Sequence, residues 1–452
     1  IRDKLVTGVQ TCALPIWAAA SAAFQVEGAC DEDGKGPGIW DALCDGHVAH
    51  GDNGSVACDH YHRYREDIAI MKELGLQSYR FSVSWPRVMP KEGVVNEKGL
   101  RFYSDLVDAL LDAGIEPMCT VFHWNLPMWL HEKGGWHNPA TADAMATYAG
   151  LLSDRLSDRV RYWMTVNEPA CFVGLGYLTG DHAPFERAMD LPQAESQSVM
   201  QNVTRVALLA HGKAVKALRD HAHQPLQIGM ALCGSVHTPW EETPEGIEAA
   251  RQLTMDTHQG VFQVPFFADP TILGQIPPEM EGILTAEDRT IIHQKLDFFG
   301  FNSYYSSNYE DFRGPNPHVV PGQPRTAMGW AITPDVLYWA SRFFYERYRL
   351  PILITENGMA NIDFVMRDGK VHDPQRIEYL AAYLASLERA AEEGIPLIGY
   401  CYWSLLDNFE WAAGYDKRFG LVHVDYTTQK RTIKDAGYWY ADVIRRGGVS
   451  GL

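Results

Sequence analysis

Two kinds of segment alternate along the chain, and this alternation strongly restricts the possible fold. Short apolar or β-branched runs, which predict strands, alternate with longer amphipathic stretches that end at a glycine, which predict helices. Gly75, Gly114 and Gly394 stand where a left-handed residue ends a helix, after the predicted helices 64–74, 100–113 and 376–393. The predicted strands are 17–24, 78–83, 117–122, 162–166, 227–232, 298–302, 352–355 and 397–402.

Eight strand–helix units predict an α/β fold, a single (β/α)8 TIM barrel with extended loops after its strands. An open doubly wound sheet is the alternative, but no G-x-G-x-x-G sequence follows the first strand. The 452 residues of the chain agree with one barrel, because such barrels commonly exceed ~250 residues as a single domain. We predict a barrel domain at 17–445 and a flexible tail at 446–452.

The first residues do not belong to this pattern. Residues 6–16 are V-T-G-V-Q-T-C-A-L-P-I, which is the in-frame translation of a common sequencing-adapter oligonucleotide. We hypothesise that residues 1–16 are a read or assembly scar that replaced the native start. The segment imitates a secretory signal, but Pro15 interrupts its apolar middle and cleavage near Ala20 would cut into the first strand. Because Pro15 cannot donate a sheet hydrogen bond, we also expect the altered lead-in to lower stability.

Resequencing of the source locus tests the scar hypothesis. Finding the eleven codons of residues 6–16 in genomic DNA, without a library adapter, would contradict it.

Composition excludes several classes of partner. The chain has 39 basic and 57 acidic residues, a formal charge of −18, whereas nucleic acid and anionic membranes require clustered Lys and Arg. After the first residues, no window approaches the ~20 apolar residues of a membrane span. Eight scattered cysteines without a C-x-x-C pair are typical of free thiols in a reducing compartment. We predict a cytoplasmic protein, provided that the replaced start carried no signal peptide, and a homo-oligomer is compatible with the sequence.

Two glutamates stand where a barrel of this type carries its chemistry, just after the carboxyl ends of strands. Glu168 follows the fourth strand within N-E-P, and Glu356 follows the seventh strand within T-E-N-G. Cleavage of a glycosidic bond needs such a pair, since one group protonates the leaving oxygen and the other attacks or activates water. Each motif alone is also an ordinary turn. The coincidence of both with strand ends favours the catalytic interpretation.

Other candidate residues have ordinary structural explanations. His60 and His62 lie two residues apart with Asp59 and without a third ligand nearby, which favours helix surface or core packing over a metal site. Isolated tryptophans are usually core residues. We predict no metal and no cofactor, because two carboxyl groups suffice for glycosidic hydrolysis.

From Trp17 to about Tyr440 the chain resembles glycoside hydrolase family 1, the β-glucosidase family. The resemblance implies a retaining, exo-acting β-glycosidase. This enzyme would remove terminal non-reducing β-D-glucosyl residues from β-glucosides and short oligosaccharides such as cellobiose, through a covalent glycosyl-enzyme. The motifs are Q-V-E-G-A at 25–29, D-H-Y-H-R-Y at 59–64, Y-R-F-S-V-S-W-P-R at 79–87, H-W-N-L-P at 123–127, T-V-N-E-P at 165–169, F-F-G-F-N-S-Y-Y at 298–305, I-T-E-N-G at 354–358, Y-W-S-L-L-D-N-F-E-W at 402–411 and R-F-G-L-V-H-V-D at 418–425.

The resemblance also implies residue roles. Glu168 is expected to be the general acid/base and Glu356 the nucleophile, with Arg80 and Tyr304 keeping Glu356 ionised. Ionised Glu356 should raise the pKa of Glu168, and retention implies a carboxyl separation of ~5–5.5 Å. Trp403 is expected beneath the sugar and Trp330 at the rim beside the leaving group. The full set of expected sugar-binding residues is Gln25, His123, Trp124, Asn167, Asn302, Tyr304, Trp330, Trp403, Glu410, Trp411 and Phe419.

Three positions depart from the family pattern. Asn125 replaces the usual Asp and should affect the orientation or tautomer of His123. Ala170 replaces a frequent Trp and should open the leaving-group site, and Phe185 replaces a usual Gly.

Two alternative functions remain. A 6-phospho-β-glycosidase is disfavoured because Glu410 would repel a phosphate, and an inactive sugar-binding barrel would follow if the altered N-terminus disabled the enzyme.

Overall fold

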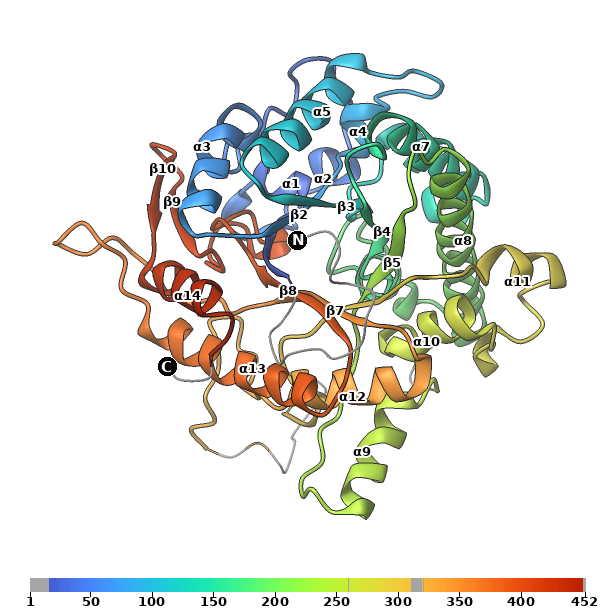
Figure 1. Cartoon of the computed structure of the whole chain (residues 1–452). Helices are drawn as coiled ribbons and strands as arrows, with labels where there is room; N and C mark the ends of the chain where they lie inside the picture. The colour runs from blue at the N-terminus through green and yellow to red at the C-terminus, as the bar shows by residue number, and fades with distance from the viewer. Residues whose placement is uncertain (1–15, 259, 310–318, 320, 450–452) are drawn as a thin grey trace.

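The computed structural model describes residues 16–258, 260–309, 319 and 321–449. Within these ranges, eight parallel strands close a barrel in chain order, as predicted, and Figure 1 shows helices surrounding it. The strands are β1 (Trp17–Ala20), β2 (Ser78–Ser82), β3 (Glu116–Phe122), β4 (Tyr162–Asn167), β5 (Gln227–Leu232), β6 (Phe299–Asn302), β7 (Ile352–Asn357) and β8 (Leu397–Trp403). A separate antiparallel pair, β9 (Val422–Asp425) and β10 (Lys430–Ile433), lies outside the barrel.

The helices cover the strands with apolar stripes of helical period. In α5 (Glu97–Asp112), Leu100, Tyr103, Leu106 and Leu110 are buried, and the side chain of Asn96 caps the first turn by accepting from Lys98 N. The longer helices are α3 (His60–Glu73), α5, α7 (Ala140–Leu156), α8 (Gln193–Asp220), α9 (Pro244–Met255), α12 (Val336–Tyr348), α13 (Pro374–Glu392) and α14 (Asp435–Arg446). The shorter ones are α1 (Ala23–Val26), α2 (Ile39–Ala42), α4 (Trp85–Val88), α6 (Met128–His131), α10 (Val264–Ala268) and α11 (Ala286–Ile292), with a π-helical segment at Ala170–Thr179.

The first strand is shorter than predicted. β1 ends at Ala20, because Ser21 N donates to Arg80 O and the chain then turns into α1, where Ala23 N donates to Ser82 Oγ at 2.7 Å. The alanines that suit a barrel strand also favour a helix, so composition alone did not mark this boundary. Gln25 therefore lies on a short helix instead of directly after a strand. The other predicted strands differ from the observed ones by at most two residues at either end.

The N-terminal lead-in, residues 1–15, lies outside the described residues, so the scar hypothesis and the expected loss of stability remain predictions. β1 itself pairs with β2 on one side and with β8 on the other. Trp17 is buried against Tyr440 of α14, with ring centroids 5.9 Å apart. Because α14 ends at Arg446, the first residue of the predicted tail belongs to this helix.

Neither membrane-spanning helices nor disulfides occur in the described ranges. Every helix there is too short or too polar to span a lipid bilayer. Each of the seven cysteines in those ranges is free, as the scattered spacing predicted.

Candidate active site

A cavity of about 870 Å³ opens at the carboxyl ends of the strands, within the size range of small-molecule sites. Most of the predicted site residues line it. They are His123, Trp124, Glu168, Asn302, Tyr304, Trp330, Glu356, Trp403, Glu410 and Trp411. The other predicted residues lie outside the cavity lining and act through contacts with it. They are Gln25, Arg80, Asn167 and Phe419.

Glu356 is held by a cation and a phenol. Arg80 Nη1 lies 2.6 Å from Glu356 Oε1, and Tyr304 OH donates to Oε2 at 2.7 Å. Arg80 is fully buried and is itself fixed by Thr120 Oγ1, which accepts from its Nε at 3.0 Å. These two donors orient both carboxylate oxygens of Glu356 and favour its ionised form.

Glu168 has a different environment. Asn302 Nδ2 donates to Glu168 Oε1 at 2.7 Å, and the Glu168 backbone has φ +46°, in the left-handed region that non-glycine residues seldom adopt. Burial, and then the charge of Glu356, raise the pKa of Glu168 to about 7. The expected influence of Glu356 is present, but burial is the larger cause.

The two environments decide where a single shared proton resides. Burial raises the pKa of Glu356 as well, while Arg80 and Tyr304 act to lower it. Because Glu356 is the carboxyl group in contact with a guanidinium, the proton goes to Glu168. Of this pair, Glu356 is therefore the ionised group and Glu168 holds the proton below a pH of about 7. This is the division that acid catalysis and nucleophilic attack require.

Asn167 connects the two carboxyl groups to His123. Its Oδ1 accepts from Arg80 Nη2 at 2.7 Å and from Asn302 Nδ2 at 3.1 Å, which fixes the orientation of the amide. Asn167 Nδ2 must then donate to His123 Nε2, 3.1 Å away. Burial, and then Arg80, lower the pKa of His123 well below its usual value, so the ring is neutral and carries its proton on Nδ1. Within the described chain that Nδ1 has no protein partner, which leaves it available to a ligand.

The family departure at position 125 does not act on this ring. Asn125 Oδ1 accepts from Trp40 N at 3.1 Å and its Nδ2 donates to Asp41 at 3.2 Å. The Asn125 side chain thus connects the loop after β3 to α2. The expected effect on His123 is wrong, because Asn167 sets the tautomer.

The other two departures have local consequences. Ala170 lines the cavity, as expected of a small residue at the leaving-group wall. Phe185 adopts φ +65°, the conformation for which glycine is favoured, and its ring stacks on His47 at 3.9 Å.

Aromatic rings form one wall of the cavity. The His123 ring stacks near Trp403 and Trp411, with centroid distances of 6.0 and 5.9 Å and interplanar angles of 22° and 17°. Trp330 packs against Tyr304 and Phe419, with ring centroids 5.0 and 6.0 Å apart. Flat apolar faces beside hydrogen-bonding groups suit a ligand with an apolar ring face and polar edges.

Glu410 is a further carboxyl group of the cavity, whose lining also includes Asp181. Gln25 Nε2 donates to Phe409 O at 2.8 Å and approaches Glu410 Oε2 at 3.4 Å. Burial, followed by the charges of Glu356 and Glu168, raises the pKa of Glu410 to about 8. Glu410 is therefore mostly neutral at pH 7, and can both donate and accept hydrogen bonds.

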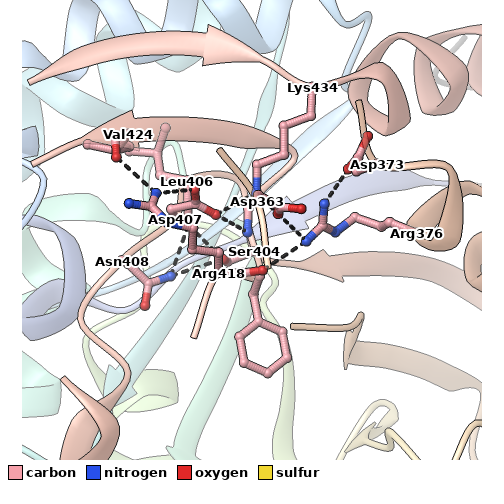
Figure 2. A network of polar contacts seen from close by, with 12 residues as sticks. Asp363, Asp373, Arg376, Ser404, Leu406, Asp407, Asn408, Arg418, Val424 and Lys434 are labelled. Atoms are coloured by element: carbon pink, nitrogen blue, oxygen red, sulfur yellow. Dashed lines mark hydrogen bonds and ion pairs between the residues drawn. The ribbon is translucent and has the colours of Figure 1, made fainter. Parts of the chain in front are cut away.

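A buried charged network supports the loop that carries Glu410 and Trp411 (Figure 2). Lys434 Nζ lies 2.6 Å from both Asp363 Oδ2 and Asp407 Oδ1, and Arg376 Nη2 also binds Asp363 at 2.6 Å. Asp407 accepts from Gly420 N and from Arg418. The residue after it, Asn408, accepts from Gln25. The network thus fixes the segment between β8 and the cavity-lining residues Glu410 and Trp411.

The cavity wall also contains residues that were not among the predicted ones. Cys171 and Cys233 line the cavity beside Glu168. His182 also lines the cavity, and burial lowers its pKa to about 4. The strand-end rule that located Glu168 also applies to Cys233, which directly follows β5. Cys171 carries no such signal, because it lies inside the segment that follows Glu168 and only the fold brings it to Cys233.

The barrel, the two carboxyl groups of unequal proton affinity and the aromatic wall together define a glycoside hydrolase. Comparison with known proteins agrees. Beta-glucosidase A of Thermotoga maritima is 42% identical over 444 residues, covering 96% of this chain and 97% of the relative. Beta-glucosidase A of Acetivibrio thermocellus is 43% identical over 452 residues, covering 96% and 98%. The structure of the Thermotoga maritima beta-glucosidase in complex with glucoimidazole has a TM-score of 0.86 and 42% identity, and the alignment covers 97% of this chain and 100% of that one.

The chain belongs to glycosyl hydrolase family 1, whose family model matches residues 14–449. Since the glycosidases of this family are retaining, the enzyme is a retaining glycoside hydrolase.

Proposed function

We propose that this enzyme removes terminal, non-reducing β-D-glucosyl residues from β-glucosides and short oligosaccharides such as cellobiose. Glu356 serves as nucleophile and Glu168 as acid/base. The observation that carries the proposal is the unequal environment of the two carboxyl groups, with Arg80 and Tyr304 on Glu356 and an amide on Glu168. The substrate class follows the relatives, which are named beta-glucosidases.

In the first step, Glu356 attacks the anomeric carbon while Glu168 gives its proton to the glycosidic oxygen, so that the aglycone leaves as an alcohol. Formation of the glycosyl ester removes the negative charge of Glu356, which lowers the proton affinity of Glu168. In the second step, Glu168 takes a proton from water, the hydroxide attacks the anomeric carbon, and the ester bond to Glu356 breaks. Both carboxyl groups end as they began. This sequence requires carboxyl groups ~5–5.5 Å apart, a separation that stays a prediction.

The side chains proposed to bind the sugar hydroxyls have defined roles as hydrogen-bond donors or acceptors. His123 Nδ1–H donates, and Gln25 Oε1, which lies directly behind the lining residue Glu410 and has no protein partner in the described ranges, is assigned as an acceptor. Asn167 Nδ2 keeps one hydrogen after binding His123 and directs it to the 2-hydroxyl. Neutral Glu410 binds hydroxyls in either role.

A phosphorylated sugar suits this cavity poorly. The charge of Glu356 raises the proton affinity of Glu168 and of Glu410, which line the same cavity, so the site already disfavours a second negative charge. A phosphate dianion would add charge of the same sign. The uncharged substrate is therefore preferred over the 6-phospho alternative.

The leaving-group side is open and aromatic. Ala170 and Trp330 line the cavity, and we assign both to the aglycone site, where Trp330 stacks and the small Ala170 leaves room for varied aglycones.

A cytoplasmic location is also part of the proposal, supported by the free thiols in the described chain.

Hydrolysis by Glu168→Ala tests the acid role of Glu168. We expect a loss of about 10²–10⁴-fold on an alkyl β-glucoside, which needs a proton on its leaving oxygen. Formation of the glycosyl-enzyme from a dinitrophenyl β-glucoside, measured in a rapid-mixing burst, should be nearly unchanged, because that phenolate leaves without a proton. Equal losses in both reactions would contradict the assignment. Absence of turnover in the unaltered enzyme would favour the inactive sugar-binding barrel.

The pH profile gives an independent test of Glu168. Its pKa is raised to about 7, and only the protonated form donates. The kcat/KM for an alkyl β-glucoside should therefore fall as the pH rises through about 7. In Glu168→Gln this alkaline limb should disappear from the residual activity. A limb that survives in Glu168→Gln would assign the titration to another group.

A further inference from the structure

Two thiols and the proposed acid/base lie together on one wall of the cavity. Cys171 Sγ and Cys233 Sγ are 3.6 Å apart, and a carboxylate oxygen of Glu168 lies within 4.8 Å of both sulfurs. Glu168 and Cys171 come from the segment after β4, where Cys171 N donates to Glu168 O at 2.9 Å. Cys233 follows β5, the neighbouring strand. Both cysteines are half-buried and line the cavity, so a solute in the cavity can reach them.

We propose that Cys171, Cys233 and Glu168 form a binding site for a thiophilic divalent cation, of the zinc or cadmium class, which inhibits the enzyme. Two sulfurs bound at ~2.3 Å to a tetrahedral Zn²⁺ stand ~3.8 Å apart, close to the separation of the two free thiols. The carboxylate oxygen supplies a third ligand and the open cavity leaves the fourth position to water.

The donor set determines which cations fit. Two sulfurs and one oxygen suit Zn²⁺ and Cd²⁺, whereas Mg²⁺ and Ca²⁺ require a shell of oxygens. Binding replaces the thiol protons, which pass to solvent, and changes no oxidation state. The cation would act as an inhibitor and not as a cofactor, because it occupies the carboxylate that must give and take the catalytic proton. This consequence rests on the role proposed for Glu168, whereas binding itself does not.

Cadmium titration of the chelator-treated enzyme tests the site. We expect a thiolate-to-cadmium ultraviolet absorption that saturates at about one equivalent, since the three ligands form one site. Hydrolysis of a nitrophenyl β-glucoside should fall in parallel by at least about tenfold, and EDTA should restore it. Mg²⁺ should have no effect.

Cys171→Ser and Cys233→Ser identify the ligands. Each should raise the Cd²⁺ concentration for half-inhibition, relative to its own uninhibited rate, by at least about tenfold and should weaken the absorption. Cys30→Ser is the matched control, because Cys30 is also half-buried but lies outside this cavity, and it should stay fully sensitive.

Several outcomes would overturn the proposal. Unchanged absorption and inhibition in both serine variants would place the cation elsewhere. Recovery that needs a phosphine reductant and does not follow EDTA would show instead that dissolved oxygen had oxidised Cys171 and Cys233 to a disulfide. If the absorption follows the prediction while activity stays unaffected, the cation site stands, but its inhibitory effect and the role proposed for Glu168 both fail.

Discussion

Glu356→Ala is expected to abolish hydrolysis of a nitrophenyl β-glucoside, with kcat lowered by about 10⁴–10⁶-fold, the scale on which loss of a catalytic nucleophile acts. The substitution removes the atom that forms the glycosyl-enzyme. Fold and sugar binding should persist, because Arg80 keeps its bonds to Thr120, Thr355 and Asn167. The measurement is steady-state turnover, with unfolding of the variant followed in parallel.

Azide separates loss of the nucleophile from general damage. The alanine leaves space beside Arg80 for a small anion, so azide should restore turnover and give an α-glucosyl azide, inverted relative to the substrate. Glu392→Ala, an exposed position of α13, is the matched control and should retain activity without responding to azide. A β-configured azide product, or wild-type activity in Glu356→Ala, would contradict the assignment.

Lys434→Met is expected to be the most destabilising single change. Lys434 is fully buried and neutralises Asp363 and Asp407, each 2.6 Å from its Nζ (Figure 2). Its removal leaves buried carboxylates with less positive charge, which typically costs about 3–5 kcal/mol in the free energy of unfolding. Urea unfolding measures this loss.

The same variant should also affect substrate binding. Asp407 supports the segment that carries Glu410 and Trp411, so the KM for a nitrophenyl β-glucoside should rise more than kcat falls in molecules that remain folded. Lys370→Met, on an exposed turn, is the control and should change the free energy of unfolding by less than about 0.5 kcal/mol. A loss below about 1 kcal/mol in Lys434→Met would show that Arg376 and Arg418 suffice for the network.

The order of strands and the location of the chemistry were predictable from short-range patterns. A period of two or 3.6 residues depends on local backbone geometry, and in a parallel barrel all strand ends meet on one face. Glu168, Glu356 and Trp403 could therefore be assigned to one cavity from their positions after predicted strands. The end of β1 could not, because Ser21 turns the chain through contacts with β2 that lie 59 residues away in the sequence.

The main cause of the raised pKa of Glu168 and the tautomer of His123 could not be predicted from the sequence. Burial contributes more to the raised pKa of Glu168 than the predicted charge of Glu356 does. The tautomer of His123 depends on Asn167, whose orientation depends in turn on Arg80 and Asn302. Desolvation and hydrogen-bond direction are properties of an assembled surrounding, and no spacing along the chain encodes them.

By itself the sequence determined that this chain is a (β/α)8 barrel with two strand-end glutamates and a set of family motifs. Periodicity and residue type are properties of residues that are close in sequence, so they can be recognised without knowing the tertiary contacts. Only the assembled structure shows that burial is the larger cause of the raised pKa of Glu168, that Asn125 acts on α2 instead of His123, and that Cys171 and Cys233 meet beside Glu168. Each of these depends on side chains brought together from distant segments, where distances of a few ångströms set the electrostatic energies.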